Sequence, residues 1–153
     1  MNHIKNLIAL LLVTGLSFVS LSVSAASSSN SVTGVSGYDL VAYHSDSAAT
    51  RGNGHNVSEH DGVTYLFSSA SNKKAFDANP EKYLPAYGGW CAFGVSVGKK
   101  FVSDPEAWKI VDGKLYLNLD KNIQKDWLKD VPGRINKANA NWSNIKNTPA
   151  SEL

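Results

Sequence analysis

Two Asp-Gly pairs constrain the fold of this chain more than any other feature of its sequence. Asp61-Gly62 lies within residues 57–67 and Asp112-Gly113 lies within residues 108–119, two stretches in which polar and apolar residues alternate. Asp-Gly readily adopts the positive φ angles of a type I′ turn, which joins the two strands of a tight hairpin. The sequence therefore predicts two antiparallel β-hairpins.

The register of the first hairpin predicts the surroundings of a histidine. A two-residue turn at Asp61-Gly62 pairs His60 with Val63. Because side chains alternate between the two faces of a strand, His60 then shares a face with Tyr65 and Phe67. We therefore expect this histidine to face aromatic side chains.

The second hairpin predicts a sheet that is buried on one face only. Its apolar face carries Trp108, Ile110, Leu115 and Leu117, and its other face carries Lys109, Lys114, Tyr116 and Asn118. Such alternation is typical of antiparallel strands with one solvated face.

Short helices are expected between and after the hairpins. Ser69 can cap a helix that runs through Phe76, and Asn79-Pro80 starts another turn of helix toward Tyr83. Asp120 caps a later helix that ends at Pro132-Gly133, with an apolar stripe of Ile123, Trp127, Leu128 and Val131. A last helix carries Ile135, Ala138 and Trp142.

Hairpins alternating with helices, without the spacing of βαβ units, predict an α+β fold. We expect a small antiparallel sheet built from two β-hairpins and packed with several short helices.

The first 25 residues have the pattern of a cleavable signal peptide. Lys5 precedes an apolar run over residues 7–23, and Val23-Ser24-Ala25 supplies the small residues that signal peptidase reads. A retained membrane anchor is the alternative, because the run is only a little shorter than the ~18 to 20 residues of a membrane span. Its serine-rich end and small-residue exit favour cleavage after Ala25. The mature protein is therefore expected in the periplasm or outside the cell.

The mature chain is expected to form one domain over residues 37–146. Residues 26–36, rich in Ser, Asn and Gly, have the composition of a flexible leader, and residues 147–153 that of a frayed tail. The chain carries a formal net charge of only +2, with its Lys and Arg residues scattered. Neither nucleic acid nor, after signal cleavage, a membrane is expected as a partner.

A series of short motifs follows in order between residues 37 and 92. Its centre is His60-x-Gly62-x-x-Tyr65-x-Phe67-x-Ser69, followed by Phe76 and Pro80-x-x-Tyr83. These motifs resemble the YHS domain, a small module found beside heavy-metal transport ATPases and in some monooxygenase subunits. Residues 37–43 are similar to the first strand of that family, and residues 83–92 to its exported, single-domain branch.

The resemblance implies a suspected affinity for soft metals, because many members carry cysteines in the first strand and around the start of the helix. In this chain those places correspond to Ala42, Ser68 and Asn72, so all three thiols are absent. Soft-metal binding depends on thiolate ligands. His60 remains, and Cys91 lies in a different place.

Cys91 is the single cysteine of the chain, so it cannot form an internal disulfide. If a helix starts there, after Gly88-Gly89, the thiol lies near a helix N-terminus, where the dipole lowers its pKa and favours thiolate. If the segment is a strand, Cys91 is buried on one face with Phe93 and Val95.

The leading hypothesis is a non-catalytic binding module for a transition-metal ion such as copper or zinc. Cys91 would supply a thiolate, His60 an imidazole and His44 a third ligand. Because structural zinc normally has four protein ligands, a labile or shared site is expected.

A second hypothesis is a pocket for a small organic molecule or a partner protein. Tyr43, Tyr65, Tyr87 and Trp90 are numerous enough to line one, although the same residues could form a plain core.

A third hypothesis is an enzyme in which Cys91 acts as a nucleophile or peroxide sensor with His60 as its base. The chain contains no C-x-x-C and no H-E-x-x-H motif. A binding function is therefore favoured over catalysis.

Overall fold

The computed structural model describes residues 32–153, so the predicted signal peptide over residues 1–25 lies outside the described residues. Its strands are β1 (Asn53–His60), β2 (Val63–Phe67), β3 (Asp104–Val111) and β4 (Lys114–Asn118). Its helices are α1 (Leu40–Ser45), α2 (Ala70–Ala78), α3 (Pro80–Tyr83), α4 (Ala92–Ser96), α5 (Lys121–Leu128) and α6 (Val131–Ile145). No helix within residues 32–153 combines the length and apolar composition needed to cross a membrane.

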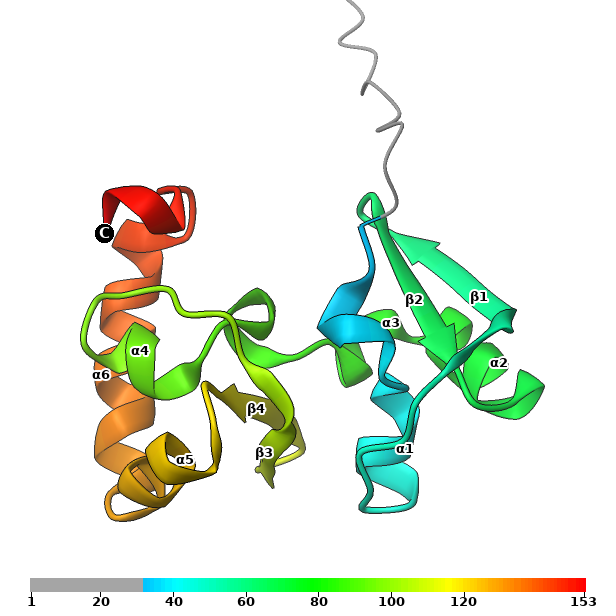
Figure 1. The fold of residues 1–153 in the computed structure, drawn as a ribbon, viewed down its shortest axis with the longest axis horizontal. Coiled ribbons are helices and arrows are strands. Elements are labelled where there is room, and N and C mark those ends of the chain that lie inside the picture. The colour runs from blue at the N-terminus through cyan, green and yellow to red at the C-terminus, as the bar shows by residue number, and fades with distance from the viewer. Residues whose placement is uncertain (1–31) are drawn as a thin grey trace, which may run out of the picture.

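The elements form the predicted α+β fold, arranged in two halves (Figure 1). β1 pairs with β2 and β3 pairs with β4, both antiparallel, but the hairpins form two separate sheets and not one. α1, α2 and α3 lie beside the first hairpin, and α4, α5 and α6 lie beside the second.

Both predicted hairpin turns are confirmed. Asp61 and Asp112 have φ angles of 50° and 49°, and the glycines that follow them have φ angles of 74° and 73°. His60 pairs with Val63, as the two-residue turn requires. Local turn chemistry therefore determines the register of both hairpins.

Strand β4 of the second hairpin is buried on both faces, whereas the sequence predicted one solvated face for the whole hairpin; on β3, Lys109 is exposed as predicted. Leu115 and Leu117, on the predicted apolar face, pack into the core of the first half. On the opposite face Asn118 is fully buried and Tyr116 is only 9% exposed, because Tyr116 packs against Trp127 of α5. The hairpin therefore lies between two cores and belongs to both.

Side-chain caps start two helices where the sequence predicted them. Ser69 Oγ accepts a hydrogen bond from the Asn72 N–H at the start of α2, at 3.1 Å. Asp120 Oδ1 accepts one from the Ile123 N–H at the start of α5, at 2.8 Å. Each cap satisfies a backbone donor that has no partner within its helix.

Pro132-Gly133 was expected to end a helix and instead begins one. α5 ends earlier, at Leu128, and α6 starts with the Pro-Gly pair in its first turn. Asp130 caps α6 through the Gly133 N–H, at 3.0 Å. Proline suits this position because the first turn of a helix makes no use of its missing N–H.

The predicted first strand over residues 37–43 is wrong, because residues 40–45 form α1. Asp39 has extended backbone, and its Oδ1 accepts hydrogen bonds from the N–H groups of Val41 at 2.9 Å and Ala42 at 3.2 Å. This N-cap starts a helix at the position where the family resemblance implied a strand. Tyr38 keeps a strand-like contact, an antiparallel bridge to Arg51.

The Asp39 carboxylate also joins α1 to the end of β2 and to α2. Its Oδ2 accepts hydrogen bonds from the Ser68 N–H at 2.8 Å, the Ser68 hydroxyl at 2.6 Å and the Asn72 amide at 2.8 Å. Asp39 is fully buried, and a buried carboxylate is costly unless its oxygens are hydrogen-bonded. Donors from three segments of the chain satisfy this one.

The domain begins earlier than the predicted boundary at residue 37. The Thr64 N–H donates to the carbonyl of Val32 at 2.8 Å, and Val35 packs against the first core. Residues 32–36 of the expected leader therefore belong to the fold, and residues 26–31 lie outside the described residues.

The expected tail is anchored as well. The ammonium group of Lys100 donates to the carbonyls of Lys146 at 2.9 Å and Thr148 at 2.7 Å. A short 3₁₀ turn over Ala150–Glu152 follows. The start of the expected tail is thus tied to Lys100, although no residue of 147–153 is buried.

Replacing Asp39 should show how much stability depends on its hydrogen bonds. We expect Asp39→Asn to lower the free energy of unfolding by about 3 kcal/mol or more, because an amide cannot accept hydrogen bonds at both of its ends. Urea denaturation followed by circular dichroism measures the change. The exposed Asp46→Asn at the end of α1 is the control, with an expected change below about 0.5 kcal/mol; equal losses in both variants would contradict the role of Asp39.

Candidate functional site

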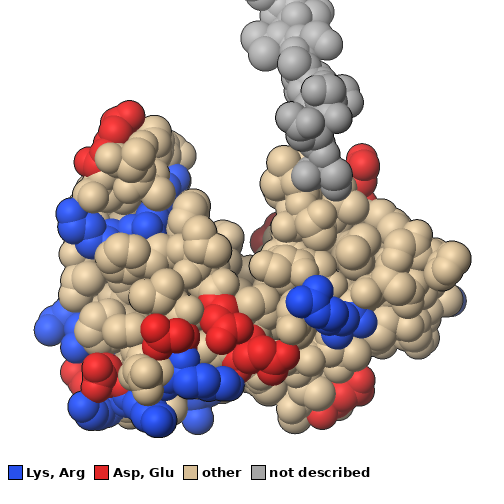
Figure 2. Space-filling view, viewed as in Figure 1, with Lys and Arg blue, Asp and Glu red and all other residues tan. Residues whose placement is uncertain are grey.

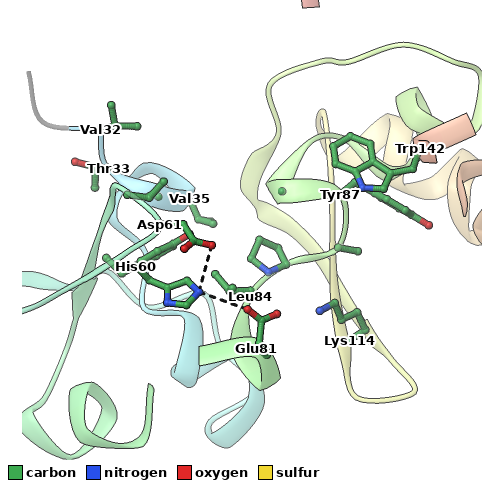
Figure 3. Close-up of a pocket in the computed structure, with 16 residues that line it drawn as sticks. Val32, Thr33, Val35, His60, Asp61, Glu81, Leu84, Tyr87, Lys114 and Trp142 are labelled. Carbon is green, nitrogen blue, oxygen red and sulfur yellow. Dashed lines mark ion pairs between the residues drawn. The ribbon is translucent and has the colours of Figure 1, made fainter. Parts of the chain in front are cut away.

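A cleft of about 590 Å³ lies between the two halves of the molecule. It is lined by segments far apart in the sequence, namely residues 32–35, the turn of the first hairpin, residues 84–88, Lys114 and Trp142. Figure 2 shows the surface hollowed between the halves, and Figure 3 shows the side chains that line the cleft.

One wall of the cleft carries His60 beside two carboxylates. The hairpin turn places Asp61 next to it, and Glu81 comes from the first turn of α3 (Figure 3). His60 Nε2 lies 3.6 Å from Asp61 Oδ2 and 3.4 Å from Glu81 Oε1. Although these separations are within ion-pair range, neither contact has the geometry of a hydrogen bond, and Nε2 is buried without a partner among the described residues.

His60 meets an aromatic side chain, as the sequence predicted, but the partner is Phe76 of α2 and not Tyr65 or Phe67. Its ring meets Phe76 edge-on with the ring centroids 6.2 Å apart, and Phe76 contacts Tyr65 with centroids 5.1 Å apart. The His60 side chain is 26% exposed. The ring is thus held by packing and is partly exposed, although Nε2 itself is buried.

The opposite wall begins at a turn in which three successive residues have positive φ. Tyr87, Gly88 and Gly89 have φ angles of 55°, 61° and 84°, a conformation that glycine adopts without strain. The Tyr87 hydroxyl donates to Asn139 Oδ1 at 2.8 Å, and its ring meets Trp142 edge-on at 5.7 Å. Burial raises the pKa of Tyr87, so its phenol stays protonated.

Lys114 supplies a positive charge to this second wall. It follows the Asp-Gly turn of the second hairpin, and Figure 3 shows its ammonium end directed toward the wall that carries Glu81. Lys114 forms no ion pair within residues 32–153. The cleft therefore carries carboxylates on one wall and an ammonium group on the other.

Two of the four predicted aromatic residues line the cleft, namely Tyr65 and Tyr87. Trp90 lines a neighbouring hollow of about 200 Å³. Tyr43 is fully buried, and its hydroxyl donates to the carbonyl of Pro105 at 2.9 Å. The first three residues lie at or near the cleft, and Tyr43 belongs to the core.

Cys91 is both a helix N-cap and a buried residue, which combines the two alternatives left open by the sequence. The Gly94 N–H donates to its sulfur at 3.3 Å at the start of α4. The side chain is fully buried, and burial raises the pKa of the thiol despite hydrogen bonds from backbone amides. The environment therefore favours the protonated thiol.

The three predicted metal ligands do not form one cluster. Cys91 lies at the start of α4, His60 in the cleft, and His44 on α1 with its ring edge-on to Tyr83 at 5.4 Å. Burial, with Lys82 and Lys114 nearby, lowers the pKa of His44. Within residues 32–153 no group of three or more His, Cys, Asp or Glu side chains is arranged to hold a metal ion.

The places that correspond to the family's thiols do not fit a soft metal either. Ala42 is fully buried in α1. Ser68 and Asn72 both donate to the Asp39 carboxylate and so serve as structural hydrogen-bond donors.

A serine motif in α4 has no catalytic geometry. Residues 94–98 have the spacing G-x-S-x-G, which marks a nucleophile where it joins a strand to a helix. Here Ser96 is buried in the helix and its hydroxyl donates to the carbonyl of Phe93 at 2.6 Å. The context that the motif requires is absent around this residue.

Sequence reasoning missed Glu81, Lys114 and Trp142 as cleft residues. Each fitted a simpler structural role: the first turn of a helix, the polar face of a hairpin and an apolar helical stripe. The position of Lys114 could have indicated its role from the sequence. It follows the second Asp-Gly turn directly, as Val63 follows the first, and both residues line the cleft.

Comparisons of this chain with protein-family models, curated proteins and solved structures gave no significant match. The resemblance to the YHS domain rests on the motif residues between 37 and 92. Function is therefore argued from the cleft and its chemistry.

The burial of Cys91 predicts an unreactive thiol. At pH 8 we expect 5,5′-dithiobis(2-nitrobenzoate) to label native Cys91 at least about 100-fold more slowly than the urea-unfolded chain, because labelling requires an exposed thiolate. Ser143→Cys in a Cys91→Ser background supplies an exposed control thiol on α6. Native labelling of Cys91 as fast as this control would restore the thiol-enzyme hypothesis.

Proposed function

We propose that this chain is an exported, YHS-like binding module that holds a small molecule in the cleft between its two halves. The observation that carries the proposal is the cleft itself, with a volume of about 590 Å³ and a lining that combines charged groups with apolar residues such as Leu84, Pro85 and Ala86. Small-molecule sites are typically clefts of roughly 300–1,000 Å³ with a mostly apolar lining and few polar groups. The signal-peptide pattern of residues 1–25 supports export.

Both walls of the cleft are held in place by the fold. Asp39 anchors the elements that carry the first wall, and the Tyr87 hydroxyl bonds to α6 at the second. The second hairpin packs into both cores. A preformed site loses little conformational entropy when its ligand binds, which favours affinity.

A binding role agrees with the position of the cysteine better than thiol chemistry does. Cys91 does not line the cleft, and its expected base His60 does. A thiol nucleophile must be deprotonated and within reach of its base. The buried, protonated thiol of Cys91 is better explained as part of the packing around α4.

The cleft should bind small aromatic probes. We expect p-cresol and indole to bind with dissociation constants of about 1 mM, typical of fragments, and to shift the indole N–H resonance of Trp142 in ¹H–¹⁵N NMR spectra. A Trp142→Phe variant assigns that resonance. Thr33→Trp should fill the cleft and abolish the shift, because Thr33 is an exposed lining residue.

Asn136→Trp is the matched control for this experiment. It adds the same indole to an exposed position on α6 outside the cleft, so binding should be unchanged. The proposal is wrong if the probes bind equally to the wild type and to Thr33→Trp, or if no probe shifts the Trp142 indole resonance.

A second candidate function is labile binding of a divalent transition-metal ion at His60. The observation that favours it is the unpartnered Nε2 atom, with Glu81 Oε1 at 3.4 Å and Asp61 Oδ2 at 3.6 Å. Imidazole and carboxylate suit zinc or copper(II), whereas copper(I) prefers thiolates. Nε2 is buried and the three groups are not arranged around an ion within residues 32–153, so binding requires the side chains of Glu81 and Asp61, 77% and 89% exposed, to move.

Competition with a chelator for zinc and copper(II) tests this candidate. We expect His60→Ala to weaken binding by about tenfold, the size that loss of one contributor to a site produces. His55→Ala, on an exposed position of the same strand, should change nothing. If the wild type fails to compete for either ion, this second function is wrong.

A further inference from the structure

The two walls of the cleft carry opposite charges that face each other. Asp61 and Glu81 lie on the wall of the first half, and Lys114 lies on the wall of the second half. In Figure 3 the ammonium end of Lys114 is directed across the cleft toward Glu81. Charge separation of this kind orients any ligand that is itself a dipole.

Neither wall neutralises its charge within the protein. His60 is the ionisable partner beside both carboxylates, and its contacts to them are longer than a charge-assisted hydrogen bond. Lys114 forms no ion pair or side-chain hydrogen bond within residues 32–153 and does not reach Glu81. Both walls can therefore pair with charges on a ligand.

Apolar side chains line part of the cleft that also carries the charged groups. These apolar lining residues are Val63, Leu84, Pro85, Ala86 and Tyr87. The Tyr87 hydroxyl is already bonded to Asn139, so the cleft meets its ring. A ligand that fills this cleft needs an apolar or aromatic body between its charged ends.

We propose that the ligand of this cleft is a small zwitterion, with an ammonium group at one end and a carboxylate at the other. The ammonium group pairs with Glu81 and Asp61, the carboxylate pairs with Lys114, and the body lies against the apolar lining residues. This inference rests on the proposed function, because it names the chemical class that the cleft binds.

A set of matched probes tests each charge separately. 4-(Aminomethyl)benzoate carries both charges, 4-methylbenzylamine lacks the carboxylate, and 4-methylbenzoate lacks the ammonium group. Titrated into the mature protein and followed at the Trp142 indole N–H, the zwitterion should bind about fivefold more tightly than either analogue, as expected for one additional pairing of partly exposed charges. The preference should shrink in 1 M salt, because exposed pairs are screened.

Two substitutions assign each charge to its wall. In Lys114→Met the zwitterion should bind no more tightly than 4-methylbenzylamine, and in Glu81→Gln its advantage over 4-methylbenzoate should decrease. Lys109→Met and Glu59→Gln are the controls. Lys109 is on the second hairpin and Glu59 is on the first, and both residues are exposed outside the cleft. The controls should keep the full preference.

The outcomes separate this inference from the proposed function. If the zwitterion binds no more tightly than both analogues while p-cresol still shifts Trp142, the zwitterion inference is overturned and the small-molecule function stands. If the preference persists unchanged in Lys114→Met and Glu81→Gln, the charges on the walls are not its cause and the inference also fails. If no probe shifts Trp142, both proposals fail.

Discussion

The hydrogen bonds of the buried Asp39 carboxylate hold together the half of the molecule that contains His60. One oxygen starts α1, and the other binds Ser68 and Asn72, which lie where β2 ends and α2 begins. The packing of α2 against the first hairpin then brings Phe76 against the His60 ring. Without a buried acceptor at this point, three backbone and two side-chain donors would lose their partner, a cost that packing alone does not offset.

The second hairpin joins this half of the molecule to the other half. Because Leu115 and Tyr116 point to opposite faces, the same strand contributes to both cores, and neither core is complete without it. A cleft between two independently folded units would change shape as the units moved. Here a shared strand limits such motion, so the charged groups on the two walls keep their positions opposite each other.

The sequence predicted what short-range chemistry determines. The Asp-Gly turns and the caps at Ser69 and Asp120 depend on neighbours in the chain, and all are confirmed. The start of α1 was missed because the cap of Asp39 was not weighed against the family resemblance. Glu81 and Trp142 come to one cleft only through tertiary packing, so no local pattern could place them there. The metal, ligand and export assignments stay predictions.

The contacts of Lys100 join two segments that lie far apart in the chain. Its ammonium group bonds the carbonyls that follow α6 and lies over the rings of Trp90 and Trp142, at 5.7 and 5.5 Å. Acetylation of this one amine would remove the charge and leave a single N–H donor. The carboxyl-terminal turn and the loop around Lys100 would then loosen together, as one cooperative unit of low local stability at the edge of a rigid domain.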